Sequence, residues 1–176
     1  KYTGEWKDDM MHGKGIYEFK NGDKYEGEYS VGERTGQGIF IYADKRKYIG
    51  QFKNGLMNGF GAYSWPDGSK YEGYWTDDKQ NGRGKFISST GDSYDGEWTN
   101  GMMNGEGVLR LADGTKFKGF FKNGLRHGKC IEESKEGVRF EGTYKEDKRD
   151  GAYTERDKDG NIIRQGFYKN GYLESK

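Results

Sequence analysis

Aromatic residues and glycines alternate along this chain with a period of two. Tyr25–Tyr29 reads aromatic, any residue, glycine, any residue, aromatic, and the same order returns every 23 residues. The rows of this repeat begin at Tyr2, Tyr25, Tyr48, Tyr71, Tyr94, Phe117 and Phe140, and a partial repeat covers residues 164–176. A period of two predicts β-strands, because side chains two residues apart share one face of a strand.

Each of the first five rows carries a second run, in which two glycines precede a ring or a leucine. In the first row these are Gly13, Gly15 and Tyr17. If the two runs of a row pair as a hairpin, the rings of one strand can lie over the glycines of the other, where no side chain obstructs them. Glycine usually weakens a strand, but here only glycine leaves enough space for the ring of the paired strand.

The connections between these runs predict hairpins. Six residues such as Lys7–His12 are expected to join the two strands of a row, and Asn21-Gly22 or Asp67-Gly68 leads into the next row. The prediction is an all-β fold: an elongated single-layer antiparallel sheet of tandem β-hairpins, with about fourteen strands. We expect residues 1–176 to form one repeat domain, and the first residue, Lys1, suggests a piece of a longer chain.

Composition narrows the class of protein further. Hydrophobic residues make up 31% and aromatic residues 16% of the chain, with 31 glycines. Ordinary globular chains are about 45–50% apolar, so a thick aliphatic core is excluded, whereas disordered chains are poor in aromatics. With 30 basic and 29 acidic residues the net charge is +1, which argues against a nucleic-acid partner. The single cysteine, Cys130, allows no internal disulfide and suits a reducing cytosol.

The full pattern resembles the MORN repeat family. It joins aromatic-x-Gly-x-aromatic, a loop such as Lys53–Gly59, a GxGxY run and a DG turn, seven times over nearly the whole chain. The resemblance implies a single-layer stack of β-hairpins. It also implies functions found in the family: scaffolds of cytoskeletal structures, adaptors that bind a myosin tail, and proteins of membrane contacts. The repeats also occur beside lipid-kinase and methyltransferase domains.

The pattern changes toward the end of the chain. Cys130 and Tyr153 replace the second glycine of their rows, and Glu132 and Glu155 stand where the ring should be. We therefore expect the ring-lined face to fade after Leu111 and to end in a polar cap.

The sequence offers no catalytic constellation, metal site or cofactor motif, and the chain is interpreted as non-enzymatic. His12 and His127 share a small polar turn column. Cys130 has no evident activating partner and is interpreted as a small buried filler. Glu5, Glu28 and Glu97 are expected on a solvated outer face, where they pair with basic residues.

Two surfaces are candidates for binding. The first consists of second-strand rings that a single layer cannot cover, although part of the ring face must serve as core. The partner-binding candidates are Phe19, Phe40, Tyr42, Tyr63, Trp65 and Phe86. The second is an association edge of apolar pairs in alternate loops, which either meets a partner or covers its own loop. Its residues are Met10, Met11, Leu56, Met57, Met102 and Met103.

These observations predict a non-catalytic scaffold or adaptor that binds a partner protein segment along the aromatic-lined sheet. The expected partner is a peptide or helix of a cytoskeletal or motor-associated protein, with self-association at the apolar edge as a further hypothesis. We expect a cytoplasmic location, at the cytoskeleton or peripheral to a membrane, and weak or no lipid binding. The alternatives are a phospholipid-binding module, or the recognition domain of a larger enzyme whose catalytic domain lies outside this chain.

Overall fold

The computed structural model describes residues 1–174, which contain strands and turns and no helix. The partial repeat predicted for residues 164–176 therefore ends, as described, at residue 174, and residues 175 and 176 lie outside the description. The chain divides into two compact units, Lys1–Ser89 and Thr90–Lys176. That these units form one domain stays a prediction.

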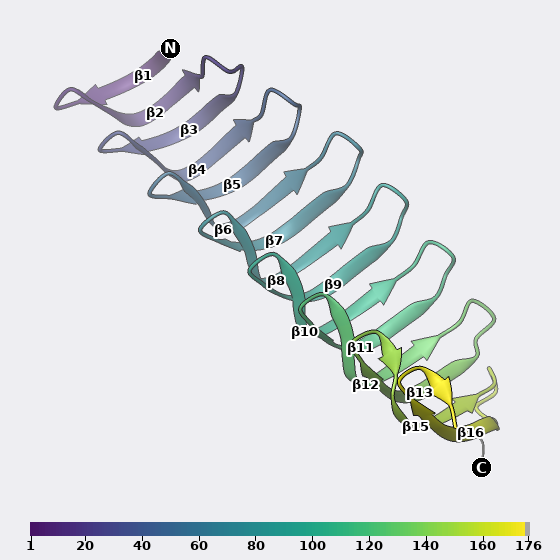
Figure 1. Cartoon of the computed structure of the whole chain (residues 1–176). Helices are drawn as coiled ribbons and strands as arrows, with labels where there is room; N and C mark the ends of the chain where they lie inside the picture. Colours follow the sequence, from purple (N-terminus) through teal and green to yellow (C-terminus); the bar gives the residue numbers. More distant parts are fainter. Residues whose placement is uncertain (175–176) are drawn as a thin grey trace. The chain divides into compact units, whose positions relative to one another are not determined.

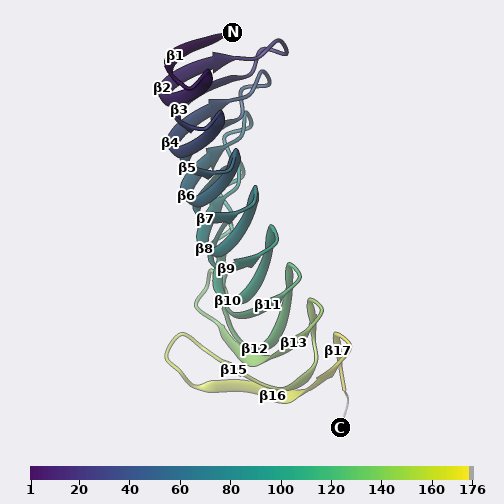
Figure 2. The ribbon, with the colours of Figure 1, turned by 90° about the vertical axis from the view of Figure 1, so that its left-hand side faces the viewer.

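Unit 1 is a single antiparallel layer of eight strands, each paired with the next in sequence. Figure 1 shows it as hairpin after hairpin. Its strands are β1 (Tyr2–Lys7), β2 (Met10–Glu18), β3 (Lys24–Ser30), β4 (Glu33–Ile41), β5 (Lys47–Lys53), β6 (Leu56–Ser64), β7 (Lys70–Thr76) and β8 (Lys79–Ile87). Figure 2 shows that these strands curve along their length.

Unit 2 continues the same plan with shorter final strands. Its strands are β9 (Ser93–Thr99), β10 (Met102–Arg110), β11 (Lys116–Lys122), β12 (Leu125–Glu133), β13 (Arg139–Lys145), β14 (Lys148–Arg149), β15 (Gly151–Arg156), β16 (Ile162–Lys169) and β17 (Tyr172–Leu173). β13 pairs with both β14 and β15, and β16 with β15 and β17. The prediction of a single-layer antiparallel array of tandem hairpins is confirmed.

The prediction of a six-residue loop within each row is wrong. The two strands of a row are joined by two residues, such as Asp8-Asp9, Val31-Gly32 or Asn54-Gly55, all with positive φ. Positive φ at both central residues defines the type I′ turn, whose twist matches that of the flanking strands. Even the β-branched Val31 adopts φ 50°, a conformation that such residues rarely occupy.

A β-bulge recurs within the hairpins, shifting the register between the turn and the glycines. In the first hairpin Gly4 pairs with Gly15 while Trp6 pairs with Met11, so the second strand holds extra residues around Gly13, where φ is 59°. Such bulges bend a strand and increase its twist.

The first-strand carboxylates have a role at this bulge that the sequence analysis did not predict. The Oε1 atom of Glu5 accepts a hydrogen bond of 2.9 Å from the backbone N–H of Lys14. In the next row Glu28 accepts one of 3.0 Å from Gln37 N–H. The expectation that Glu5 and Glu28 pair with basic side chains is therefore corrected: they satisfy backbone donors that the bulge leaves unpaired.

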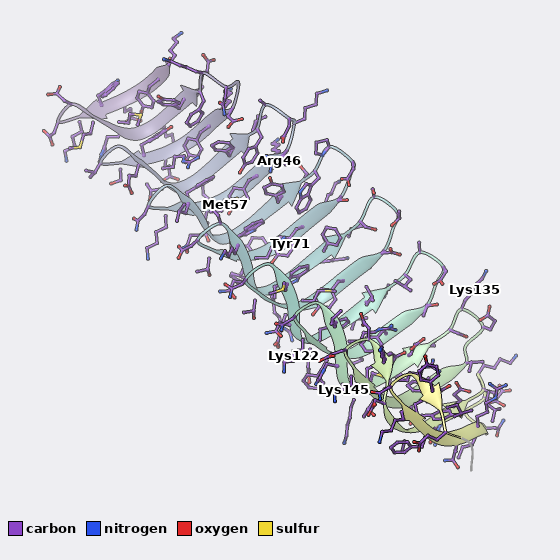
Figure 3. The ribbon with its side chains drawn as sticks, viewed as in Figure 1. Arg46, Met57, Tyr71, Lys122, Lys135 and Lys145 are labelled. Atoms are coloured by element: carbon purple, nitrogen blue, oxygen red, sulfur yellow. The ribbon has the colours of Figure 1, made fainter. Side chains whose placement is uncertain are left out.

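The tyrosine that opens a row lies flat against two glycines. A Cβ atom built on Gly27 would lie 2.4 Å from the Tyr25 hydroxyl, and one on Gly38 would lie 2.5 Å from it. Tyr25 is fully buried, and its hydroxyl donates a hydrogen bond of 3.0 Å to the carbonyl oxygen of Glu28. Tyr48 and the labelled Tyr71 of Figure 3 repeat this arrangement.

These tyrosines also connect neighbouring rows. Tyr25 meets Tyr29 of its own row edge-to-face at 5.2 Å and Phe52 of the next row at 5.0 Å, both centroid to centroid. Edge-to-face pairs of this kind stabilise beyond the area they bury. Within each unit the core is thus a row of rings on one face of the layer, and neighbouring hairpins support each other.

The substitutions toward the end of the chain match this geometry. In the row of Phe117, Cys130 replaces the glycine of the second strand and is buried. Phe117 lacks the hydroxyl that a tyrosine would place over that position, so the thiol has room. In the following row Phe140 stacks on Tyr153 at 5.6 Å with an interplanar angle of 17°.

We predict that Gly38→Cys destabilises unit 1 by ~1–3 kcal/mol, because the new side chain overlaps the Tyr25 ring and core overpacking costs about this much. The double variant Tyr25→Phe with Gly38→Cys reproduces the Phe117–Cys130 pair and should recover part of the loss. Urea denaturation of the single and double variants measures the loss of stability and its partial recovery. Strictly additive effects would contradict the proposed contact between ring and glycine.

Candidate functional site

Second-strand rings form an unbroken series on the ring face of unit 1, here called the ring ladder. Its members are Tyr17, Phe19, Phe40, Tyr42, Tyr63, Trp65 and Phe86. Successive ring centroids lie 4.5 Å apart from Tyr17 to Phe19 and 5.7 Å from there to Phe40. The distances continue at 4.6, 6.0, 4.6 and 5.9 Å up to Phe86. The six predicted partner-binding residues therefore all lie in one contact series, which Tyr17 extends.

The ladder has a buried layer and a half-buried layer. Phe40 and Tyr63 are 7% and 6% exposed and serve as core. Phe19, Tyr42 and Trp65 are half-buried, and each lies just beyond the last strand residue of its row. Their backbones are fixed by the five-residue turns; Tyr42 N–H, for example, donates to Arg46 C=O at 2.9 Å. The half-buried rings are thus held by rigid turns while one side stays accessible.

Two arginines border the ladder. The guanidinium carbon of Arg34 lies 4.9 Å from the centroid of Phe40, and that of Arg46 lies 4.5 Å from Tyr42, within cation–π range. Arg46 is paired with Asp44 at 2.7 Å. Arg34 donates to the carbonyl oxygen of Gly55 at 2.5 Å, and none of the ion pairs found in residues 1–174 includes it. Figure 3 shows Arg46 at the five-residue-turn end of the strands.

Burial makes two of the ladder hydroxyls, those of Tyr42 and Tyr63, harder to ionise. It raises the pKa of Tyr42 to about 12, with a smaller effect from Tyr63 and an opposing effect from Arg46. Burial likewise raises the pKa of Tyr63. Both hydroxyls therefore remain hydrogen-bond donors at neutral pH.

The structure separates the two members of each apolar pair at the predicted association edge. Because the turn is only two residues long, each pair opens the second strand, and consecutive side chains point to opposite faces. Met57 is 8% exposed and pairs with Phe52 on the ring face, whereas Leu56 is 37% exposed. Met10 and Met102 are exposed, as Leu56 is. Met11 and Met103 occupy the same position as Met57 in their rows and are half-buried. The two members of a pair therefore lie on opposite faces of the layer, and self-association at this edge stays a prediction.

The face opposite the rings is not uniformly charged. Phe60 and Tyr74 lie side by side at 5.5 Å and are 46% and 52% exposed. Ile49, also exposed, lines a shallow groove with Ile39 and the carboxylate-bearing Glu26. Ile16 and Ile39 of this groove share a repeat column with Ala62, Val108 and Ile131, a signal from which part of the surface could have been predicted. Ile49 and Phe60 stand in mostly polar columns and gave no such signal.

In unit 2 ion pairs replace the ladder. Glu132, at a ring position, lies 3.6 Å from Arg149 and 4.0 Å from Arg126, and it accepts a hydrogen bond of 2.5 Å from the Tyr144 hydroxyl. Arg149 covers the Phe140 ring at 3.9 Å and also pairs with Glu155 at 3.6 Å. The second-strand ring columns thus end in carboxylates that are joined to arginines, whereas rings such as Phe117, Phe140 and Tyr153 remain buried after Leu111.

Cys130 is a free cysteine whose side chain is buried in the core of unit 2. Burial raises the pKa of its thiol to about 12, with Glu132 adding to the effect, so the nucleophilic thiolate is scarce at neutral pH. In the described part of the chain, no group of three His, Cys, Asp or Glu side chains could hold a metal ion. No helix long and apolar enough to cross a membrane occurs among these residues.

Hairpins repeated at a fixed interval, with tyrosines resting on glycines in a single layer, define a β-hairpin repeat protein. The family model of the MORN repeat matches residues 2–24, 25–45, 48–70, 71–93, 94–116, 117–139 and 140–152. The chain belongs to the MORN-repeat family. A comparison with curated proteins gives no match.

Solved structures share the fold at low sequence identity. One is the TCP domain of Drosophila melanogaster SAS-4 (dCPAP) in complex with a proline-rich motif of Ana2 (dSTIL). It is 11% identical, with a TM-score of 0.56, and the match covers 93% of this chain and 85% of that one. Another is the G-box domain of the microcephaly protein CPAP, 14% identical with a TM-score of 0.51, covering 89% and 87%. At these identities the likeness concerns the fold alone.

We predict that unit 1 loses stability as the pH rises from about 10 to 12. The ordinary pKa of tyrosine is about 10, and burial raises that of Tyr29 to about 12, an effect that Arg34 opposes. In this interval the unfolded chain releases protons that the folded chain retains, so stability falls. Tyrosinate absorbance and far-UV circular dichroism should change together. Full ionisation near pH 10 with the sheet intact would be inconsistent with buried rings.

We also predict opposite outcomes for adjacent substitutions at the start of β6. Met57→Ser should lower the free energy of unfolding by ~2–3 kcal/mol, because it removes a buried side chain. Leu56→Ser, on the exposed side, should change it by less than ~0.5 kcal/mol. Chemical denaturation of both variants provides the comparison, and equal losses would show that the strand register is wrong here.

Proposed function

We propose that this chain is a non-catalytic scaffold or adaptor module that binds a segment of a partner protein along the ring ladder of unit 1. The observation that supports it is the series of rings in contact, whose outer members Phe19, Tyr42 and Trp65 are only half-buried. A single layer has no second sheet or helix to cover them.

The physical properties of the ladder suit protein recognition. Aromatic side chains give large contact areas with few rotatable bonds, so little entropy is lost when a partner fixes them. The backbone turns already hold these rings in place, which lowers the cost of ordering further. Tyr42 and Trp65 add polar donors, so a partner can be oriented as well as held.

The structural neighbours support the same use. The Drosophila domain is named as a complex with a proline-rich motif, and the name of the CPAP G-box structure suggests a role in centriole elongation. We infer that this chain, too, serves at a cytoskeletal or membrane-linked structure.

Phospholipid binding and a recognition role within a larger enzyme stay predictions. Sedimentation with anionic liposomes tests the former, for which a net charge of +1 gives little attraction.

A peptide-display selection against the intact chain tests this function. Selected peptides should bind the unaltered protein and lose at least about tenfold in affinity to Tyr42→Ser or Trp65→Ser, as expected for aromatic hot spots. Fluorescence anisotropy with labelled peptides measures the affinity. Thermal denaturation of each variant confirms that it is folded.

The matched control is Tyr74→Ser, which removes an exposed tyrosine from the opposite face. It should leave the affinity unchanged. If the selected peptides lose binding to Tyr74→Ser and keep it for the ladder variants, the proposed surface is wrong.

A further inference from the structure

The accessible rings of the ladder recur at a fixed spatial interval. Phe19, Tyr42 and Trp65 occupy the same position of successive rows, so each is separated from the next by two strands. Neighbouring strands lie ~4.8 Å apart, which places one accessible ring every ~9.6 Å along the ladder. Phe40 and Tyr63 fill the floor between these rings.

This interval matches one conformation of a bound chain. A polyproline II helix has three residues per turn and a rise of 3.1 Å per residue, which gives ~9.3 Å per turn. An α-helix has a pitch of ~5.4 Å, and an extended strand repeats its side-chain direction every ~6.8 Å. Side chains seven residues apart on one face of an α-helix recur at ~10.5 Å, so the ~9.3 Å turn of polyproline II lies nearest to the interval of the rings.

We propose that the ring ladder takes a polyproline II segment that runs across the strands, with a proline at every third residue. This inference rests on the proposed function and names the class of partner. Each proline ring packs against one accessible aromatic ring, the kind of contact that aromatic-lined domains make with proline-rich segments. The accessible rings Phe19, Tyr42 and Trp65 span four strand spacings, ~19 Å. A polyproline II segment of about seven residues covers this length, and it places three prolines on the three rings.

Charge and hydrogen bonding add two requirements for the segment. A polyproline II backbone has no internal hydrogen bonds, so its carbonyl oxygens need donors, and Tyr42 and Trp65 each carry one. Arg34, whose guanidinium lies over Phe40, has no ion-pair partner in the described part of the chain. An acidic residue between the prolines complements this cation.

Synthetic peptides of defined proline spacing test the inference without altering the protein. The reference is a ten-residue peptide with prolines at positions 1, 4 and 7, one glutamate after the first proline and otherwise alanine. A second peptide of the same composition has prolines at positions 1, 5 and 9, which moves each later proline a further ~3.1 Å out of phase with the rings. A third has prolines at positions 3, 6 and 9, which restores the spacing of three. Affinities are measured by fluorescence anisotropy against the intact chain and against Trp65→Ser.

The reference should bind, the peptide with prolines four residues apart should bind about tenfold more weakly, and the peptide with prolines at positions 3, 6 and 9 should bind to within about threefold of the reference. Trp65→Ser should reduce the difference between the first two peptides. Equal affinities for all three peptides would overturn the inference. If display selection yields ladder-dependent peptides without this proline spacing, the inference fails while the proposed function stands. If no ladder-dependent peptide binds at all, both fail.

Discussion

A tyrosine ring lying flat on two glycines is the contact on which this structure depends. Tyr25 occupies the space that side chains at Gly27 and Gly38 would need, and its hydroxyl is satisfied by the Glu28 carbonyl. The ring covers backbone that would otherwise meet water, so one layer of sheet has a core of its own. This explains how a chain with only 31% hydrophobic residues folds. It also explains why the repeat is so regular: each ring needs a glycine on its own strand and another on the partner strand.

The candidate binding surface follows from the same contact. The tyrosines that open the rows, such as Tyr25, Tyr48 and Tyr71, pack flat on the glycines and are buried. The rings that follow the glycines of the second strand lie beside these tyrosines. Phe40 and Tyr63 fill the gaps, while Phe19, Tyr42 and Trp65 remain half-buried at one per repeat. Where the tyrosine is replaced by Phe117 or Phe140, the ring columns also give way to Glu132 and Glu155, and arginines cover the face. The accessible aromatic series is thus a feature of unit 1.

Much of this arrangement could be predicted from the sequence, because the repeat places equivalent residues in columns. The strand pairs, the tyrosine over its glycines and the six candidate rings all follow from a period of two and a row of 23 residues. The turn and the bulge could not be predicted this way. The extra residues at Gly13 interrupt the alternation, so Lys7–His12 looks like a loop although it holds a two-residue turn and the ends of two strands. That error placed Met57 at an outer edge, whereas the structure buries it.

Chemical shifts of glycine α-protons measure the central contact most directly. Ring currents shift protons beneath an aromatic face upfield. The α-protons of Gly27 and Gly38, under Tyr25, should therefore resonate well upfield of those of Gly68 and Gly160, around which a built Cβ atom meets nothing within 4 Å. Replacing Tyr25 by leucine should return Gly27 and Gly38 toward ordinary values while other rows keep their shifts. If all four glycines show ordinary shifts in the unaltered protein, the tyrosine does not lie on the glycines and the account is contradicted.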